Sequence, residues 1–175
     1  MLHAMIARPA PSDYAPYYGR YVDLVPAGDI REQLEVEHGR SLALLGGVSA
    51  EREMFRYAPG KWSVREVVGH VIDAERVFGY RALHFARRDP APLPSMEQED
   101  WGAASNAVER PLAELLAEWT AVRAVTVAFF RGLAQEAWWR RGVASDNSFT
   151  VAAVAHIILG HELHHRRGLE ERYLG

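Results

Sequence analysis

Four long segments with helical periodicity constrain the fold of this chain more than any other feature of its sequence. Apolar residues recur at spacings of three and four over residues 29–45, 63–88, 111–133 and 150–173, the pattern of helices with one buried face. No run that alternates apolar and polar residues is long enough to predict a β-strand. Four such helices bury their apolar faces most simply against one another, so the sequence predicts an all-α four-helix bundle.

Residues with a strong preference for helix starts mark where these segments begin. Asp29 and Thr150 can cap the first and fourth segments, because their side-chain oxygens accept hydrogen bonds from the first turn. Ser63 and Glu66 form the S-x-x-E capping box at the start of the second segment. Pro111 suits the first turn of the third, where its missing N–H costs nothing. The helix starts are therefore predicted independently of the apolar pattern.

The chain is expected to form one domain. Its 175 residues are 49% hydrophobic, which suits one core, whereas two domains would each be small. Residues 1–28 contain four prolines and are expected to form an extended lead-in, followed by a single domain over 29–175. Residues 89–110 form the longest irregular stretch, and loops of that length in compact domains are often functional.

Composition excludes several classes of protein and site. The chain has no cysteine, so it has no disulfide, no thiolate metal ligand and no cysteine nucleophile, and we expect a cytoplasmic protein. A net charge of -3 argues against a nucleic-acid partner. The sequence has no run of 18 apolar residues and no apolar signal region near its start, so we expect neither a membrane span nor a signal peptide.

Histidines are concentrated in the fourth segment, where AHIILGHELHH holds four of the chain's eight. At about 100° per residue, His161 and His165 lie about 40° apart on one helix face, one turn from each other. His156 lies about 180° from His165 and cannot join them. Val154 and Ile158 precede the pair at the spacing of an inward stripe, so the two imidazoles are predicted to face the core.

The second segment offers a third inward histidine, His70. A buried imidazole without a partner costs about 1–3 kcal/mol, so each must be hydrogen-bonded or bound to a metal ion. One histidine and an H-x-x-x-H pair supply three nitrogen donors, and three protein ligands leave coordination positions open for water or substrate. The alternative is that each is a satisfied core residue and that HELHH is a surface cluster. Spacing alone leaves both interpretations open.

Two stretches of the chain resemble the DinB/YfiT-like family. The segment 61–88, with its Trp-Ser start and its G-H-x-x-D-x-E run, is similar to the family's second helix. The segment 150–169, with its G-H-E-x-H-H run, resembles the final helix, and Glu99-Asp100-Trp101 resembles a loop before the third. The resemblance covers about residues 30–172. It implies an up-down-down-up bundle, a tendency to form homodimers, and a nickel, zinc or iron ion.

By position, the resemblance implies that His70, His161 and His165 are the metal ligands. His164 is the rival of His165, because ligands three residues apart can also chelate an ion. Asp73 and Glu162 are candidates to hydrogen-bond the ligand imidazoles, although Asp73 could equally be a solvated or salt-bridged acid. The sequence identifies no catalytic side chain beyond these. A metal-bound water or thiol would be the nucleophile.

Other residues in these segments are expected to have mainly structural roles. Glu75 and Arg81 are expected to form buried ion pairs with a partner helix. Trp62 is expected to be a hydrophobic staple with Val67 rather than a substrate contact, whereas Trp101 is expected to line a pocket. The three histidines without a partner in the pattern are expected at the surface: His3, His38 and His84.

The leading hypothesis is a metal-dependent enzyme acting on a small electrophilic molecule. A three-histidine site can lower the pKa of bound water from about 15.7 toward 7, or ionise a thiol. A thiol would have to arrive as a cosubstrate, because the chain has no cysteine. Characterised relatives include transferases that use bacillithiol or mycothiol, so the resemblance favours thiol transfer over hydrolysis. The alternatives are a non-catalytic metal-binding module and a dimeric helical interaction protein without metal.

Overall fold

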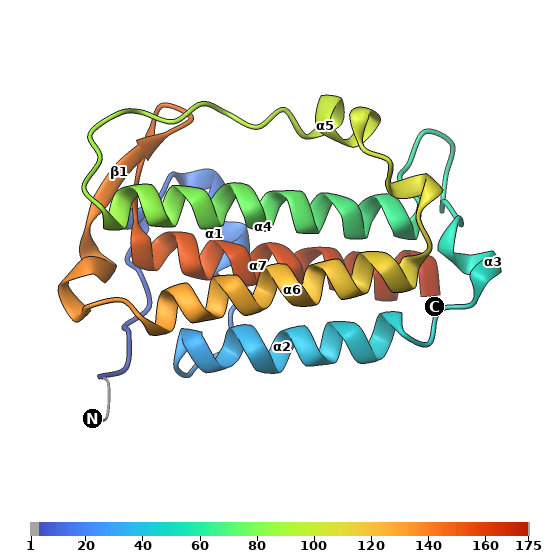
Figure 1. Cartoon of the computed structure of the whole chain (residues 1–175), viewed down its shortest axis with the longest axis horizontal. Coiled ribbons are helices and arrows are strands. Elements are labelled where there is room, and N and C mark those ends of the chain that lie inside the picture. The colour runs from blue at the N-terminus through green and yellow to red at the C-terminus, as the bar shows by residue number, and fades with distance from the viewer. Residues whose placement is uncertain (1–3, 175) are drawn as a thin grey trace.

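Four long helices form the body of the molecule in a computed structural model that describes residues 4–174. They are α2 (Ile30–Leu45), α4 (Val64–Ala86), α6 (Leu112–Arg131) and α7 (Val151–Leu169). Figure 1 shows them packed side by side, with α2 and α7 running in one direction and α4 and α6 in the other. The chain is therefore an up-down-down-up four-helix bundle, which confirms the predicted fold class.

Short elements connect and flank the long helices. They are η1 (Pro11–Asp13), η2 (Pro16–Tyr18), α1 (Gly19–Val22), α3 (Ala50–Glu53), α5 (Gln98–Ala104), η3 (Ala107–Glu109), η4 (Gln135–Trp139), β1 (Arg141–Ala144), β2 (Asn147–Thr150) and a π-helical end, η5 (Glu170–Leu174). No helix within residues 4–174 is both long and apolar enough to cross a membrane.

The predicted caps are present at three helix starts. An Asp29 carboxylate oxygen accepts from a first-turn amide at 2.9 Å. The capping box closes in both directions, since the Ser63 amide donates to Glu66 at 2.7 Å and the Glu66 amide donates to the Ser63 hydroxyl at 3.3 Å. The Thr150 hydroxyl accepts from the Ala153 amide at 3.1 Å. These bonds satisfy N–H groups that a helix start leaves without partners.

The structure contains one short hairpin that the sequence did not predict. β1 and β2 pair as an antiparallel hairpin between η4 and α7. Its turn residues, Ser145 and Asp146, both have positive φ (50° and 59°), as two-residue hairpin turns of type I′ require. Each strand has only four residues, too few to display alternation. Burial of Phe149 against the bundle holds the hairpin in place.

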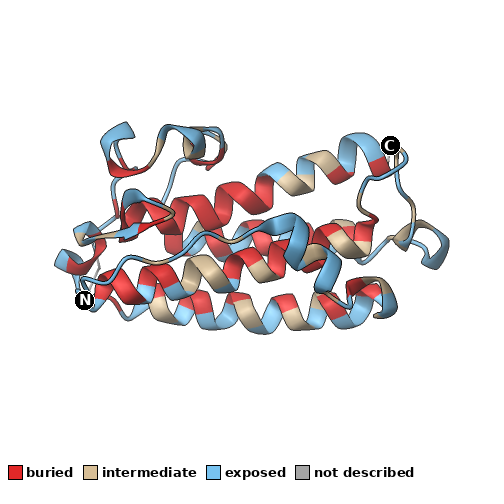
Figure 2. Ribbon diagram, turned by 90° about the horizontal axis from the view of Figure 1, so that it is seen from above, coloured by how far each residue is buried: buried red, intermediate tan, exposed pale blue. Residues whose placement is uncertain are grey.

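The segment 1–28 is not extended throughout, because η1, η2 and α1 lie within it. α1 crosses α7 at Gly160, where a β-carbon would lie 2.1 Å from the Tyr21 carbonyl oxygen. Glycine is therefore required for this close approach. With α1 and the hairpin covering it, the first half of α7 is buried on all sides, as the red ribbon in Figure 2 shows.

The stretch 89–110 contains more structure than the predicted loop. It includes α5 and η3, and Leu93 forms a parallel bridge with Ala144. The Arg81 guanidinium donates to the Pro94 carbonyl at 2.8 Å and to the Ser145 hydroxyl at 3.2 Å. Arg81, which lies on α4, thus connects this stretch to the hairpin. The expected ion pair of Arg81 is not found among the described residues.

Candidate metal centre

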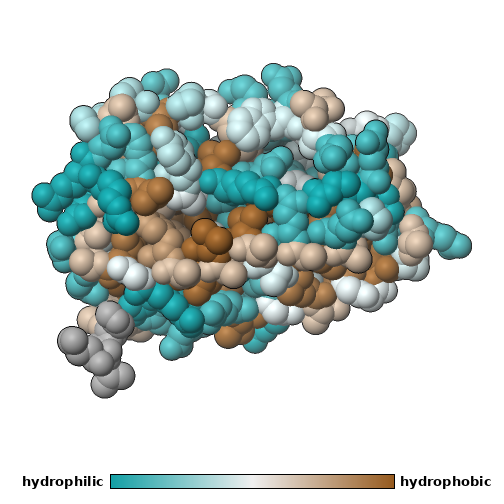
Figure 3. Space-filling model, in the orientation of Figure 1, coloured by the Kyte–Doolittle hydropathy of each residue, from teal (hydrophilic) through white to brown (hydrophobic). Residues whose placement is uncertain are grey.

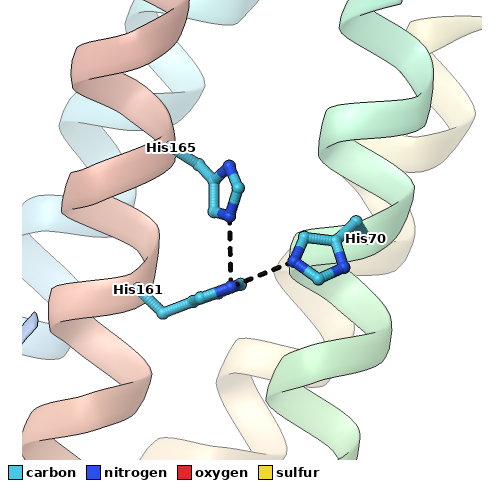
Figure 4. Close-up of side chains that lie close together, drawn as sticks. All are labelled: His70, His161 and His165. Carbon is cyan, nitrogen blue, oxygen red and sulfur yellow. Dashed lines mark hydrogen bonds between the residues drawn. The ribbon is translucent and has the colours of Figure 1, made fainter. Parts of the chain in front are cut away.

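Three imidazoles from two helices converge inside the bundle. Figure 4 shows His70 on α4 pointing toward His161 and His165 on α7. Nε2 of His161 lies 3.1 Å from Nε2 of His70 and 3.1 Å from Nε2 of His165. One nitrogen from each ring lies within 4.8 Å of the other two. The structure therefore brings together the three histidines that the sequence singled out.

The spacing of these nitrogens fits a shared cation. Zinc–nitrogen bonds of 2.0–2.1 Å at tetrahedral angles separate two ligand nitrogens by about 3.3 Å. Hydrogen bonds alone satisfy the cluster poorly, because a neutral imidazole nitrogen carries either one hydrogen or one lone pair. Nε2 of His161 therefore cannot form good hydrogen bonds to both His70 and His165. A metal ion would accept a lone pair from all three.

Burial keeps these imidazoles neutral. It lowers the pKa of His70 to about 4, that of His165 to about 3, and that of His161 well below its ordinary value. At His161 the neighbouring His165 and His70 lower the pKa further, at His165 the neighbouring His70 does so, and the Arg20 guanidinium contributes at both. Metal ligation requires the neutral imidazole, so the cluster is in the ligand form at pH 7.

Aromatic rings hold two of the imidazoles in place. The Trp62 ring packs on His70 with centroids 4.9 Å apart. The Tyr21 ring meets His161 edge-on at 5.4 Å, which the close crossing of α1 over Gly160 makes possible. Sequence reasoning missed Tyr21, because helical periodicity carries no information on which distant segment packs against a face. Trp62 was predicted only to be a hydrophobic staple at the helix start, whereas its ring packs on the candidate ligand His70.

Two pockets that share Gln98 reach the cluster. A pocket of about 540 Å³ is lined by His165 together with Trp62 and residues of α5, α7 and η5. A second, of about 330 Å³, is lined by His70 and His161 together with tyrosines of η2 and α1. An ion at the cluster would thus have coordination positions facing accessible space. Trp101, expected to line a pocket, lines neither and is about half exposed.

The two acids expected beside the ligands lie elsewhere. Asp73 faces Arg76 on its own helix at 3.7 Å, and it makes no hydrogen bond to the three histidines among the described residues. Glu162 is buried, accepts a 2.6 Å hydrogen bond from Ser41 and lies 2.7 Å from Arg123. Asp73 therefore matches its alternative interpretation as a salt-bridged acid, and the expected contact of Glu162 with a ligand imidazole is not found among the described residues. Each carboxylate has a guanidinium as its ion-pair partner.

Arg123 lies between two buried carboxylates. It pairs with Glu75 through two bonds of 2.7 and 2.8 Å and with Glu162 at 2.7 Å. Burial would raise the pKa of Glu75, but Arg123 and the hydrogen bonds from Trp119 and Thr126 together outweigh it, so the pKa is lowered. At Glu162 burial outweighs Arg123, and the pKa is raised. The expected ion pair of Glu75 with a partner helix is present, and it fixes α4 and α7 to α6.

The other histidines do not join the cluster. His164 is exposed and its ring lies 5.4 Å from that of Tyr21. His156 is buried, with Nδ1 2.8 Å from the Ala152 carbonyl of its own helix. His38 and His84 are buried, 6% and 7% exposed, which corrects the expectation of surface positions. His3 lies outside the described residues.

Comparisons with known proteins agree with the geometry. The sequence model of the DinB superfamily matches residues 33–168. Among solved structures, YfiT from Bacillus subtilis has a TM-score of 0.68 at 15% identity, over 94% of this chain and 90% of that chain. YfiT is described as a probable metal-dependent hydrolase with an unusual four-helix bundle topology. At this identity the likeness demonstrates a shared fold. No curated protein matches the chain.

Proposed function

The chain belongs to the DinB superfamily, and on that premise we propose that it is a metal-dependent enzyme with His70, His161 and His165 as ligands. The observation that carries the proposal is the convergence of three neutral imidazoles at the meeting point of two pockets. A purely structural ion would be enclosed by four protein ligands. Three ligands and an accessible side favour catalysis over a non-catalytic metal-binding module.

The donor set suits zinc, nickel or iron, since imidazole binds each of them well. When bound, such an ion supplies Lewis acidity and lowers the pKa of a water or thiol that it holds. The protein orients the ligand imidazoles and sets the charge around them. Trp62 and Tyr21 orient two of the imidazoles, and Arg20 adds positive charge near the cluster, which disfavours protonation of the ligands.

We propose a small electrophilic molecule as substrate, attacked either by water or by a low-molecular-weight thiol. Hydrolysis is supported by the description of YfiT. Thiol transfer is supported by the two adjoining pockets at one cluster, since together they offer room for two organic molecules. The chain has no cysteine, so the thiol would be a cosubstrate.

We also propose that the enzyme is a cytoplasmic homodimer. The cysteine-free chain suits a reducing compartment. Apolar side chains gather where α4 and α6 run side by side, as the brown spheres of Figure 3 show. Apolar residues on this surface include Leu83, Val125 and Phe129, of which Val125 is 71% exposed. Such a surface supports contact with a second copy, and light scattering of the purified protein measures the oligomeric state.

Metal analysis of protein purified without a histidine tag tests the ligand assignment. After loading with zinc and dialysis, we expect about one ion per chain in the wild type and in His164→Ala. His161→Ala and His165→Ala should lose most of it, because two imidazoles bind far more weakly than three. Full occupancy in His161→Ala would overturn the assignment. Loss in His164→Ala equal to that in His165→Ala would make His164 a ligand.

Turnover separates the two reactions and the enzyme from its rivals. Metal-loaded protein is incubated with a panel of small electrophiles, with and without thiols, and the products are identified by mass spectrometry. A thiol adduct above the uncatalysed rate indicates transfer, and a hydrolysed product without thiol indicates hydrolysis. Metal-loaded protein that turns over no member of the panel would favour the non-catalytic module.

A further inference from the structure

The larger pocket beside His165 has a cationic rim built from separate parts of the chain. Arg20 comes from α1, Lys61 from the turn before α4, and Arg172 from η5. Lys61 is the only lysine in the sequence. Arg167 of α7 also lines the pocket. Arg167 and Arg172 lie near the carboxyl end of α7, where a cation suits the helix dipole, whereas Lys61 lies outside any helix.

Most of the rim charge has no acidic partner. Arg167 is neutralised by Glu171 at 2.7 Å, and Glu99 is the other acid on the pocket wall. Arg20, Lys61 and Arg172 have no carboxylate within ion-pair distance among the described residues. Arg20 instead lies 3.7 Å over the Tyr17 ring, and Arg172 donates to the Tyr57 hydroxyl at 3.2 Å. Aromatic contacts of this kind position a guanidinium and leave its charge available.

The pocket has the dimensions and walls of a small-molecule site. Its volume of about 540 Å³ lies within the usual range for ligand pockets. Trp62 and Tyr57 supply flat apolar surface to the pocket wall. His165 also lines the pocket and connects it to the candidate metal centre. A nucleic acid or a membrane surface would require a broad basic face, whereas this chain has a net charge of -3. The arrangement therefore selects a small anion.

We propose that Arg20, Lys61 and Arg172 bind an oxyanion, a carboxylate or phosphate group, on the substrate whose reactive end faces the metal centre. The inference deepens the proposed function and rests on it for the reaction, but binding of the anion does not require turnover. Charged donors bind oxyanions through short charge-assisted hydrogen bonds. The rim holds one end of the substrate, and the opposite end extends past Trp62 toward His165.

Because Lys61 is the only lysine, its amine is a built-in reporter of this rim. Reductive methylation with ¹³C-formaldehyde labels Lys61 and the terminal amine only, and dimethylation keeps the positive charge. The labelled, zinc-incubated protein is titrated with succinate and with methyl phosphate, each against its neutral analogue, succinamide or methanol. We expect saturable shifts of the Lys61 signal with the anions and not with the neutral compounds. Which anion binds more tightly distinguishes the carboxylate source from the phosphate source.

Variants separate the rim from the metal. We expect Arg172→Met and Arg20→Met each to weaken anion binding about threefold at low salt, the usual effect of one exposed charge. Arg87→Met, at the far end of α4, is the matched control and should bind as the wild type does. Raising the ionic strength should weaken binding, since exposed charges are screened.

Three results would overturn the proposal: equal shifts with succinate and succinamide, shifts that do not saturate, or equal affinity in the rim variants and Arg87→Met. The last result would place the anion on the metal alone. The proposed function fails separately, through absent metal binding or absent turnover, and neither of those readouts involves the Lys61 signal.

Discussion

Single histidines on one helix have different roles because of what surrounds each ring. His156 and His161 are both buried on α7, at 4% and 6% exposure. Nδ1 of His156 lies 2.8 Å from a carbonyl of its own helix, so this ring is satisfied locally as a donor. Nε2 of His161 instead meets two other imidazoles. Burial alone therefore does not identify a ligand, and convergence of several donors does.

The buried, locally bonded His156 predicts a loss of stability in mild acid. Burial lowers its pKa from 6.5 to about 4. Above pH 6.5 both the folded and unfolded forms are neutral, and as pH falls from 6.5 toward 4 only the unfolded form takes up the proton. This group should therefore cost about 2 kcal/mol of unfolding free energy by pH 5.

Urea unfolding at pH 7 and pH 5 measures the effect. His156→Leu is the comparison, because it removes the titrating group while keeping an apolar side chain. The variant should lose less stability than the wild type between the two pH values. An equal loss in both proteins would show that other groups cause the acid sensitivity.

Among the elements, α7 carries the site because its caps, its apolar face and one glycine cooperate. Thr150 fixes its start, and Gly160 lets α1 cross directly beside His161. The contact places the Tyr21 ring against that imidazole. A helix face that would otherwise be open is thereby closed by a segment from the other end of the chain.

Gly160→Ala should separate α1 from α7. The added methyl group would lie 2.1 Å from the Tyr21 carbonyl oxygen, so we expect a loss of about 1–3 kcal/mol of unfolding free energy. Gly39→Ala on α2 is the matched control, since nothing lies within 4 Å of its position. It should stabilise the protein by about 0.5–1 kcal/mol. Chemical denaturation measures both, and a stabilising Gly160→Ala would contradict the close crossing.

Across the whole molecule, one buried cation joins the four long helices. Arg123 of α6 pairs with Glu75 of α4 and Glu162 of α7, and donates to the Leu34 carbonyl of α2 at 2.7 Å. Glu75 and Glu162 belong to the helices that carry the candidate ligands. The cluster therefore depends on this network for the relative depth of α4 and α7.

Arg123→Met should destabilise the bundle by about 3–5 kcal/mol, because it leaves two buried carboxylates without their cation. Arg131→Met on the same helix is the control. Its pair with Glu35 is half exposed, at 53% and 47%, so its loss should cost at most about 1 kcal/mol. Thermal or urea unfolding compares the two. Similar small losses would show that the buried network is not important for stability.

Much of the site follows from patterns local to the sequence. The capping box at Ser63 and the apolar spacing of α7 predict the helices, and the helical repeat places His161 and His165 on one face. The inward position of His70 offered a third donor, and the resemblance to a known family favoured its pairing with that face. The four-residue strands of the hairpin were missed, since strands of that length carry no measurable period.

By itself, the sequence determined where the helices begin, which faces are apolar and which three histidines could act together. Only the tertiary structure decided that Asp73 faces Arg76, that His38 and His84 are buried, and that Arg20 and Lys61 meet at one pocket. The physical reason is the distance along the chain over which each effect acts. Caps and periodicity arise from backbone geometry within a few residues, whereas the partner of a side chain depends on which distant segment packs against it.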